Sequence, residues 1–102
     1  LAQKLVKIRL FDDSDGVMNI DLLTIQGELL IVSQFTLPAA TKKGNRPSYI
    51  KAARPEHAIP LYEKFINECH QLMGRPPQTG QFGADMKVEL LNDGPVTIII
   101  EK

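Results

Sequence analysis

Apolar residues recur every three or four positions between residues 55 and 73, and this spacing predicts one long amphipathic helix. Pro55 and Pro60 are expected only in or before its first turn, because proline lacks the N–H that later turns require. Gly74 is the predicted C-cap. The predicted buried stripe comprises Ile59, Tyr62, Phe65, Ile66, Cys69, Leu72 and Met73.

The first quarter of the chain alternates short apolar segments with a polar turn. Residues 1 to about 7 have helical spacing, and residues 8–11 predict a short strand. Residues 12–16 predict a turn, because small polar side chains bond their own backbone and Gly16 supplies a positive φ. Residues 17–23 predict a second strand, which ends near the next glycine.

Three further runs predict strands. Residues 28–37 are the clearest, and the segment 29–32 is apolar at consecutive positions, so this strand is expected to be central and buried. Pro38 ends its hydrogen-bonding ladder. Residues 84–91 and 96–100 predict an antiparallel hairpin around a polar turn.

These elements predict an α/β fold of the α+β type: a layered β/β/α domain with mixed, largely antiparallel sheets and one main helix. No repeat or linker divides residues 1–102, so a single domain is expected. A domain of this size buries only about two-thirds of its unfolded surface, and a partner subunit would add stability.

Composition narrows the classes of function. The formal net charge is zero, which argues against a protein that binds along nucleic acid through charge alone. A protein that binds only one end of an RNA is still compatible with this charge. No apolar run approaches the roughly 20 residues that cross a bilayer, and the amphipathic start does not resemble a signal peptide. The single cysteine, Cys69, is expected to be a buried thiol, and a cytoplasmic location is predicted.

Familiar catalytic and cofactor motifs are absent from the sequence. It contains no nucleophile elbow, P-loop or dinucleotide fingerprint. His57 and His70 lack companion ligands at metal spacing, so no metal and no cofactor are predicted, and both are expected at the helix surface or edge. The turn at 12–16 does not fit a calcium loop.

Polar residues interrupt the apolar run where the strand at 28–37 ends. On a strand, Ser33 and Phe35 face one way and Gln34 and Thr36 the other, so an amide and a hydroxyl can face one site. The alternative is a strand that loses its core character near its end.

The turn at 92–97 contains Gly94 followed by Pro95. An X-Pro bond adopts the cis form far more easily than other peptide bonds, and glycine lets another molecule approach the backbone closely. A rigid pair of carbonyls could test the shape and handedness of a ligand. The alternative is an ordinary β-turn.

Taken together, these segments resemble the D-aminoacyl-tRNA deacylases, first described as D-tyrosyl-tRNA deacylases. The resemblance runs in order through nearly the whole chain. It rests on RLFDDSDGVMN at 9–19, SQFTL at 33–37, TKKGNRPSY at 41–49, LYEKF at 61–65, TGQFGADM at 79–86 and NDGPVT at 92–97.

The resemblance implies a homodimer that proofreads tRNA by hydrolysing the ester between a D-amino acid, or mischarged glycine, and the terminal adenosine. It implies that Gly94-Pro95 is a cis dipeptide inserted into the partner's site, where its carbonyls exclude L-amino acids. The floor of the site would comprise Ser33, Gln34, Phe35 and Thr36, and the terminal adenine would be held by Phe82, Gly83, Ala84 and Met86.

The loop at 38–54 carries basic residues, and long loops without secondary structure are often functional. Lys42, Lys43 and Arg46 are expected to contact tRNA phosphates, although a solvated loop is the alternative. Two features depart from the family: Pro38 stands where an aromatic residue is usual, and the family's N-terminal strands, with an arginine that braces the Gly-Pro element, are expected to be missing.

No Ser/His/Asp set could activate Thr36. Backbone amides near Phe35 and Thr36 are therefore expected to stabilise the oxyanion, with the ribose 2′-hydroxyl orienting a water. The alternatives to a deacylase are a non-catalytic domain of the same fold that binds the tRNA 3′ end, and a dimerisation domain.

Overall fold

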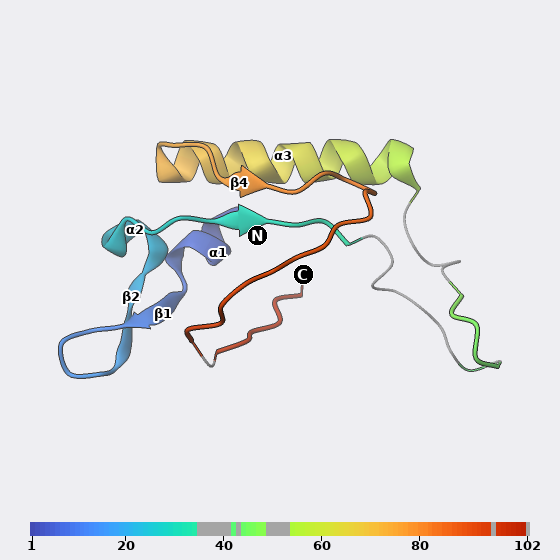
Figure 1. Cartoon of the computed structure of the whole chain (residues 1–102). Helices are drawn as coiled ribbons and strands as arrows, with labels where there is room; N and C mark the ends of the chain where they lie inside the picture. Colours follow the sequence, from blue (N-terminus) through green and yellow to red (C-terminus); the bar gives the residue numbers. More distant parts are fainter. Residues whose placement is uncertain (35–41, 43, 49–53, 95, 102) are drawn as a thin grey trace.

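The computed structural model describes residues 1–34, 42, 44–48, 54–94 and 96–101. In the view of Figure 1, a long helix lies above two short parallel strands, and an antiparallel hairpin lies below these strands. The elements are α1 (Ala2–Lys7), β1 (Arg9–Asp12), β2 (Met18–Asp21), α2 (Leu22–Ile25), β3 (Leu30–Ile31), α3 (Pro55–Met73) and β4 (Gln78–Thr79).

The helix α3 spans the predicted residues from Pro55 to Met73, with proline in its first turn. Gly74 caps its C-terminus at φ 76°, and the Gly74 N–H donates to the His70 carbonyl at 2.9 Å. The expectation for Pro60 is wrong, because this residue lies in the second turn of the helix. Proline has no N–H to donate to the carbonyl four residues earlier in the helix. Because this part of the helix is exposed, that carbonyl is open to water.

The strands β1 and β2 confirm the two predicted N-terminal strands with shifted bounds, and they form an antiparallel hairpin in which Arg9 pairs with Asp21 and Asp12 with Met18. The Asp13 carboxylate closes the turn by accepting from the Asp15 and Val17 N–H groups at 2.9 and 3.0 Å. These hydrogen bonds, the one from Val17 first, lower the pKa of Asp13. The turn prediction is therefore confirmed by local side-chain bonds.

The second strand ends earlier than predicted, because Leu22 and Leu23 belong to the short helix α2. Asp21 caps this helix, with its Oδ1 accepting from the Thr24 N–H at 2.7 Å. Gln26 ends it in the left-handed region at φ 55°. A capping aspartate within an apolar run thus converts the end of a strand pattern into one helical turn.

The strands β3 and β4 run parallel beneath α3, with Leu30 beside Gln78 and Ile31 beside Thr79. The prediction of a strand buried on both faces is wrong: Ile31 is 8% exposed, but Leu30 is 61% and Val32 45% exposed. Among the described residues, β3 pairs only with β4, and α3 covers one face. Alternate side chains along β3 therefore point away from the core.

The core lies between α1, α3 and β3. Its buried residues are Ala2, Ile31 and Cys69, and the partly buried residues packed against them are Leu5, Leu29, Tyr62, Phe65, Ile66, Leu72 and Met73. This set confirms the predicted stripe of α3 apart from Ile59, which is exposed. Cys69 is the expected buried thiol, and desolvation raises its pKa.

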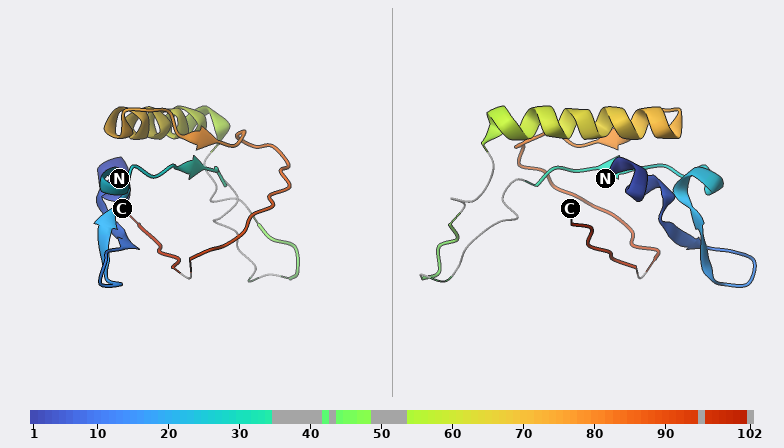
Figure 2. Two further views of the ribbon diagram at one scale, coloured as in Figure 1. Left: turned by 60° about the vertical axis from the view of Figure 1, so that its left-hand side comes forward. Right: turned by 180° about the vertical axis from the view of Figure 1, so that it is seen from behind.

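The predicted hairpin of residues 84–91 and 96–100 is wrong, because the described part of this segment forms no strand. It follows an irregular path away from α3 (Figure 2). Leu91 and Ile99 are 92% and 83% exposed. The β preference of such residues reflects packing on a covered sheet, and most side chains of this segment are left exposed.

The architecture confirms the predicted fold class, a mixed α/β arrangement with antiparallel and parallel pairing and one main helix. Within the described ranges, no helix is both long and apolar enough to span a membrane.

Candidate active site

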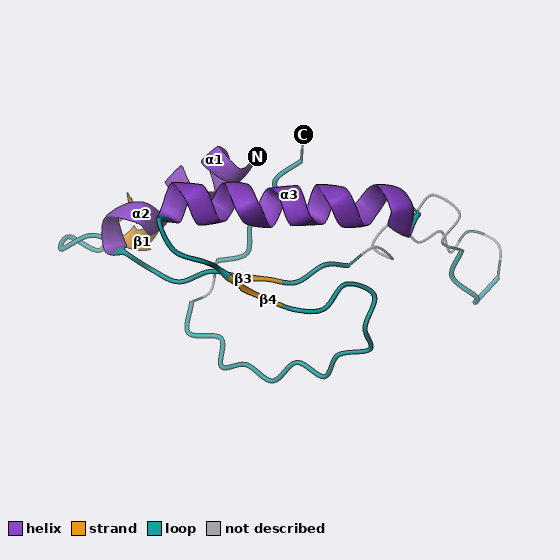
Figure 3. Cartoon of the chain, turned by 90° about the horizontal axis from the view of Figure 1, so that it is seen from above, coloured by secondary structure: helices purple, strands orange, loops and turns teal. Residues whose placement is uncertain are grey.

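Two of the sequence blocks singled out above meet beside the paired strands β3 and β4. The Gly80 N–H donates to the Ile31 carbonyl at 2.9 Å, which continues the parallel pairing beyond β4. Seen from above, the segments that follow β3 and β4 leave this junction side by side (Figure 3). Ser33 and Gln34 lie in the segment after β3, and Phe82 lies in the segment after β4. Segments far apart in the sequence are thereby brought to one place.

Ser33 is half-buried, and its Oγ is fully buried with no hydrogen-bond partner among the residues that the structure describes. A buried hydroxyl without a partner is destabilising, and such groups are uncommon in native proteins. The hydroxyl can therefore accept or donate a bond to a further polar group at this site. Gln34, next along the chain, is exposed. Phe35 and Thr36, the other predicted catalytic residues, lie outside the described residues.

The segment after β4 presents an aromatic ring and a thioether. The Phe82 ring is half-buried and lies 5.8 Å from the Tyr62 ring, centroid to centroid, at an angle of 50°. Met86 is also half-buried, and its Sδ lies only 3.0 Å from the point that a Cβ on Gly80 would occupy. Gly80 thus leaves the space that Met86 fills, and these groups form an apolar surface at the junction.

Gly83 and Ala84, the two remaining candidates in this segment, belong to a turn over residues 81–84 that also includes Phe82. Gly83 has φ 74°, and the Ala84 N–H donates to the Gln81 carbonyl at 3.2 Å. Both residues are exposed. A left-handed glycine reverses the chain here without steric cost, so that both apolar side chains can return to the junction.

Gly94 lies in a different place, beside the β1–β2 hairpin. It is exposed, and a Cβ at this position would meet nothing within 4 Å. It borders an open cavity of about 370 Å³, lined by Leu10, Phe11, Asp12, Met18, Asp93, Gly94 and Val96. Pro95 lies outside the described residues. In the described chain, the candidate chirality element therefore stands apart from the junction of β3 and β4.

The predicted phosphate-binding loop is described in part. Lys42 and Arg46 are exposed, and Lys43 lies outside the described residues. His57 and His70 are exposed on α3, as expected. Within the described parts of the chain, no three histidine, cysteine or acidic side chains gather in a group that could hold a metal ion.

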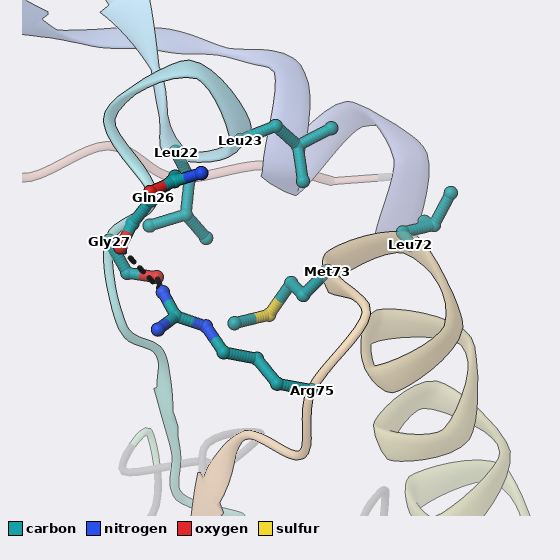
Figure 4. A pocket seen from close by; sticks show the side chains of 7 residues that line it. All are labelled: Leu22, Leu23, Gln26, Gly27, Leu72, Met73 and Arg75. Carbon is teal, nitrogen blue, oxygen red and sulfur yellow. Dashed lines mark hydrogen bonds between the residues drawn. The ribbon is translucent and has the colours of Figure 1, made fainter.

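A second cavity, of about 470 Å³, lies between α2 and the end of α3 and includes no predicted site residue (Figure 4). Arg75 crosses it and donates to the Gln26 and Gly27 carbonyls. Sequence reasoning missed this contact, since nothing in the sequence pairs a residue after α3 with the turn after α2. Because the guanidinium is bonded to the backbone, its role here is to fasten α3 to that turn.

Comparison with known proteins places the chain in a class. A family model described as D-Tyr-tRNA(Tyr) deacylase matches residues 1–101. The D-aminoacyl-tRNA deacylases of Bacteroides fragilis strain ATCC 25285 and Parabacteroides distasonis are 62% and 60% identical over 101 residues. That of Flavobacterium psychrophilum is 58% identical. In each case 99% of this chain aligns with 67% of the relative, so the chain spans about two thirds of their length.

The fold is found in a solved structure as well. The c-Myc DNA unwinding element binding protein superimposes with a TM-score of 0.85 at 36% identity, over 99% of this chain and 68% of that one. Fold and sequence together define a mixed α/β enzyme of the deacylase type. The chain belongs to the D-Tyr-tRNA(Tyr) deacylase family, and the resemblance drawn from its sequence motifs is confirmed.

Proposed function

We propose that the protein carrying this chain hydrolyses the ester between a D-amino acid and the terminal adenosine of tRNA, and releases both. Glycine mischarged onto tRNA is a second substrate. The observation that carries the proposal is the junction at the Ile31 carbonyl, where the end of β3 meets the segment after β4 in a chain of this family.

The terminal adenosine binds along the segment after β4, at Phe82, Gly83, Ala84 and Met86. The half-buried Phe82 ring and the Met86 thioether form an apolar surface suited to a flat purine. The turn at Gly83 exposes backbone amides and carbonyls that can bond the edge of the base. Exposure of this segment leaves it open to an RNA end.

Hydrolysis takes place at Ser33, Gln34, Phe35 and Thr36. Water adds to the ester carbonyl carbon, the bond to the ribose oxygen breaks, and that oxygen takes up a proton. No hydrogen-bonded base among the described residues activates Ser33, because its Oγ has no partner there. Catalysis therefore relies on positioning and on oxyanion stabilisation by backbone amides near Phe35 and Thr36, and the 2′-hydroxyl orients the water.

Chirality is judged by a second copy of the chain. The Gly94-Pro95 dipeptide of one subunit enters the site of the other as a cis element, and its carbonyls obstruct an L-side chain but admit glycine. The exposure of Gly94, with open space around it, supports a role in contact with another molecule. The exposed Lys42 and Arg46, together with Lys43, bind phosphates of the single-stranded tRNA end.

The test compares deacylation of D-tyrosyl-tRNA and L-tyrosyl-tRNA by the wild type and by Pro95→Ala. The variant is expected to lose roughly ten- to a hundredfold of the preference for the D-ester, since a steric rejection is being removed. Pro76→Ala, at an exposed proline after α3, is the matched control and keeps the preference. An unchanged preference in Pro95→Ala would exclude the chirality role, and binding without turnover by the wild type would favour a tRNA-end-binding domain.

A further inference from the structure

Tyr62, on α3, contacts both segments of the candidate active site, the one that ends β3 and the one that follows β4. Its hydroxyl donates to the Ile31 carbonyl at 3.3 Å, and that carbonyl also accepts from the Gly80 N–H at 2.9 Å. Its ring packs at a tilt against Phe82, with 5.8 Å between the ring centroids. One half-buried side chain therefore touches the strand that leads to Ser33 and the ring expected to bind adenine.

We propose that Tyr62 is a positioning residue for substrate binding, which sets the orientation of Phe82 relative to the end of β3. The inference rests on the proposed function, in which Phe82 receives the terminal adenine. Residues of the helix stripe normally have a packing role alone, and the sequence assigned none other to Tyr62. The contact with Phe82 is what distinguishes it from its neighbours on α3.

The ring and the hydroxyl of Tyr62 contribute differently. Loss of the hydroxyl leaves the Ile31 carbonyl still paired with the Gly80 N–H, so no buried acceptor becomes unsatisfied. Loss of the ring removes the tilted contact between Tyr62 and Phe82, and tilted aromatic pairs have a preferred geometry. The orientation in which a purine would lie against Phe82 then loses the support of that ring.

The expected effect falls on binding and not on the chemical step. The adenine is remote from the ester carbonyl, so its contacts are similar in the ground state and the transition state. Tyr62→Leu should raise the KM for D-tyrosyl-tRNA about three- to tenfold at unchanged kcat, as expected for the loss of one aromatic pair. Tyr62→Phe, which keeps the ring, should restore the KM of the wild type.

Direct binding isolates this effect from catalysis. The probe is D-tyrosyl-3′-amino-3′-deoxyadenosine, in which an amide replaces the ester so that it is not hydrolysed. Its Kd is measured by titration calorimetry for the wild type, Tyr62→Leu, Tyr62→Phe and Phe82→Leu in the protein carrying this chain. The Kd should rise in both leucine variants and stay near that of the wild type in Tyr62→Phe.

Phe65→Leu is the matched control, because it makes the same kind of change on the same helix. Phe65 packs against the same core but is not part of the ring pair with Phe82. It should lower the melting temperature without raising the Kd of the probe. A purely structural role for Tyr62 predicts instead that Kd follows the melting temperature equally in both variants, and this result would overturn the inference.

The results distinguish a failure of the positioning role of Tyr62 from a failure of the proposed adenosine site. If Phe82→Leu weakens probe binding and Tyr62→Leu does not, the positioning role is wrong and the adenosine site stands. If the wild type fails to bind the probe, or Phe82→Leu binds it normally, the adenosine site itself is wrong and the inference falls with it. A raised Kd in both leucine variants, with rescue in Tyr62→Phe, supports both.

Discussion

Ile31 and Ile99 are the same residue type, each within an apolar run of the sequence, but their environments in the fold are opposite. Ile31 is 8% exposed in β3, where β4 pairs with its backbone and α3 covers its side chain. Ile99 is 83% exposed in an irregular segment. The comparison teaches that burial of an apolar run depends on which other segments meet it.

The two regions also differ in how their backbones are held. Around β3, N–H groups of Gln78 and Gly80 donate to carbonyls of Leu29 and Ile31 at 2.8 and 2.9 Å. Along the described residues from 85 onward, no such ladder is formed. The proposed site lies beside this well-packed region, whereas Gly94 lies in the C-terminal segment at an exposed position that a second molecule can reach.

The largest expected difference comes from truncating the two isoleucines. Ile31→Ala should lower the free energy of unfolding by about 2–4 kcal/mol, since a buried aliphatic side chain is replaced by a cavity. Ile99→Ala should change it by less than about 1 kcal/mol, because an exposed side chain loses few contacts. Urea unfolding followed by circular dichroism measures both. Equal losses would contradict the comparison and show that residues 84–101 are covered by a surface outside this chain's own contacts.

A middle-sized effect is expected at the link between α3 and the turn after α2. Arg75→Gln removes the guanidinium that bonds the Gln26 and Gly27 carbonyls, and should cost about 1–3 kcal/mol of unfolding free energy. Arg9→Gln is the control, because Arg9 bonds only the exposed Asn19 side chain at 3.0 Å among the described contacts, and it should cost less. Similar stability of the two variants would mean that Arg75 does not fasten this turn.

The smallest effect concerns pH and the cap of α2. The side-chain and backbone hydrogen bonds of Thr24 hold the pKa of Asp21 below its ordinary value. A group whose pKa is lower in the folded state stabilises the fold above its unfolded pKa, and this contribution is lost as pH falls through the folded value. Unfolding midpoints of the wild type should therefore decline on acidification below about pH 4.

Asp21→Asn tests this assignment, because asparagine can cap a helix but does not titrate. Its midpoint should stay close to that of the wild type at neutral pH and decline less in acid. Asp21→Ala loses the cap as well and should be less stable at neutral pH. Parallel pH profiles for the wild type and Asp21→Asn would remove Asp21 as a cause of the acid sensitivity.

The sequence predicted well those elements whose signals are local. The helix α3 was placed from its apolar period, its first proline and Gly74, all of which act within a few residues of each other. The turn at Asp13 was likewise predictable, because its carboxylate bonds N–H groups two and four residues ahead. The errors at Pro60 and at Leu22 were also local: at Pro60 the helix continued through a single proline, and at Leu22 the Asp21 cap overrode the strand pattern.

The candidate site was predictable in its parts but not in its assembly. The motifs pointed to Ser33, Gln34, Phe82 and Met86, yet nothing in their spacing places the two pairs together. Tyr62 was read only as part of the apolar stripe, because its contact with Phe82 spans 20 positions and that with Ile31 spans 31.

By itself, the sequence determined the family, the long helix, the turn at residues 12–16 and the identity of the candidate residues, because these depend on local pattern and on motifs. Only the tertiary structure decided that one face of β3 is buried, that residues 84–101 are exposed, and that Tyr62 and Arg75 connect distant segments. The physical reason is that burial and long-range hydrogen bonds arise from the meeting of segments, and neither segment carries that information alone.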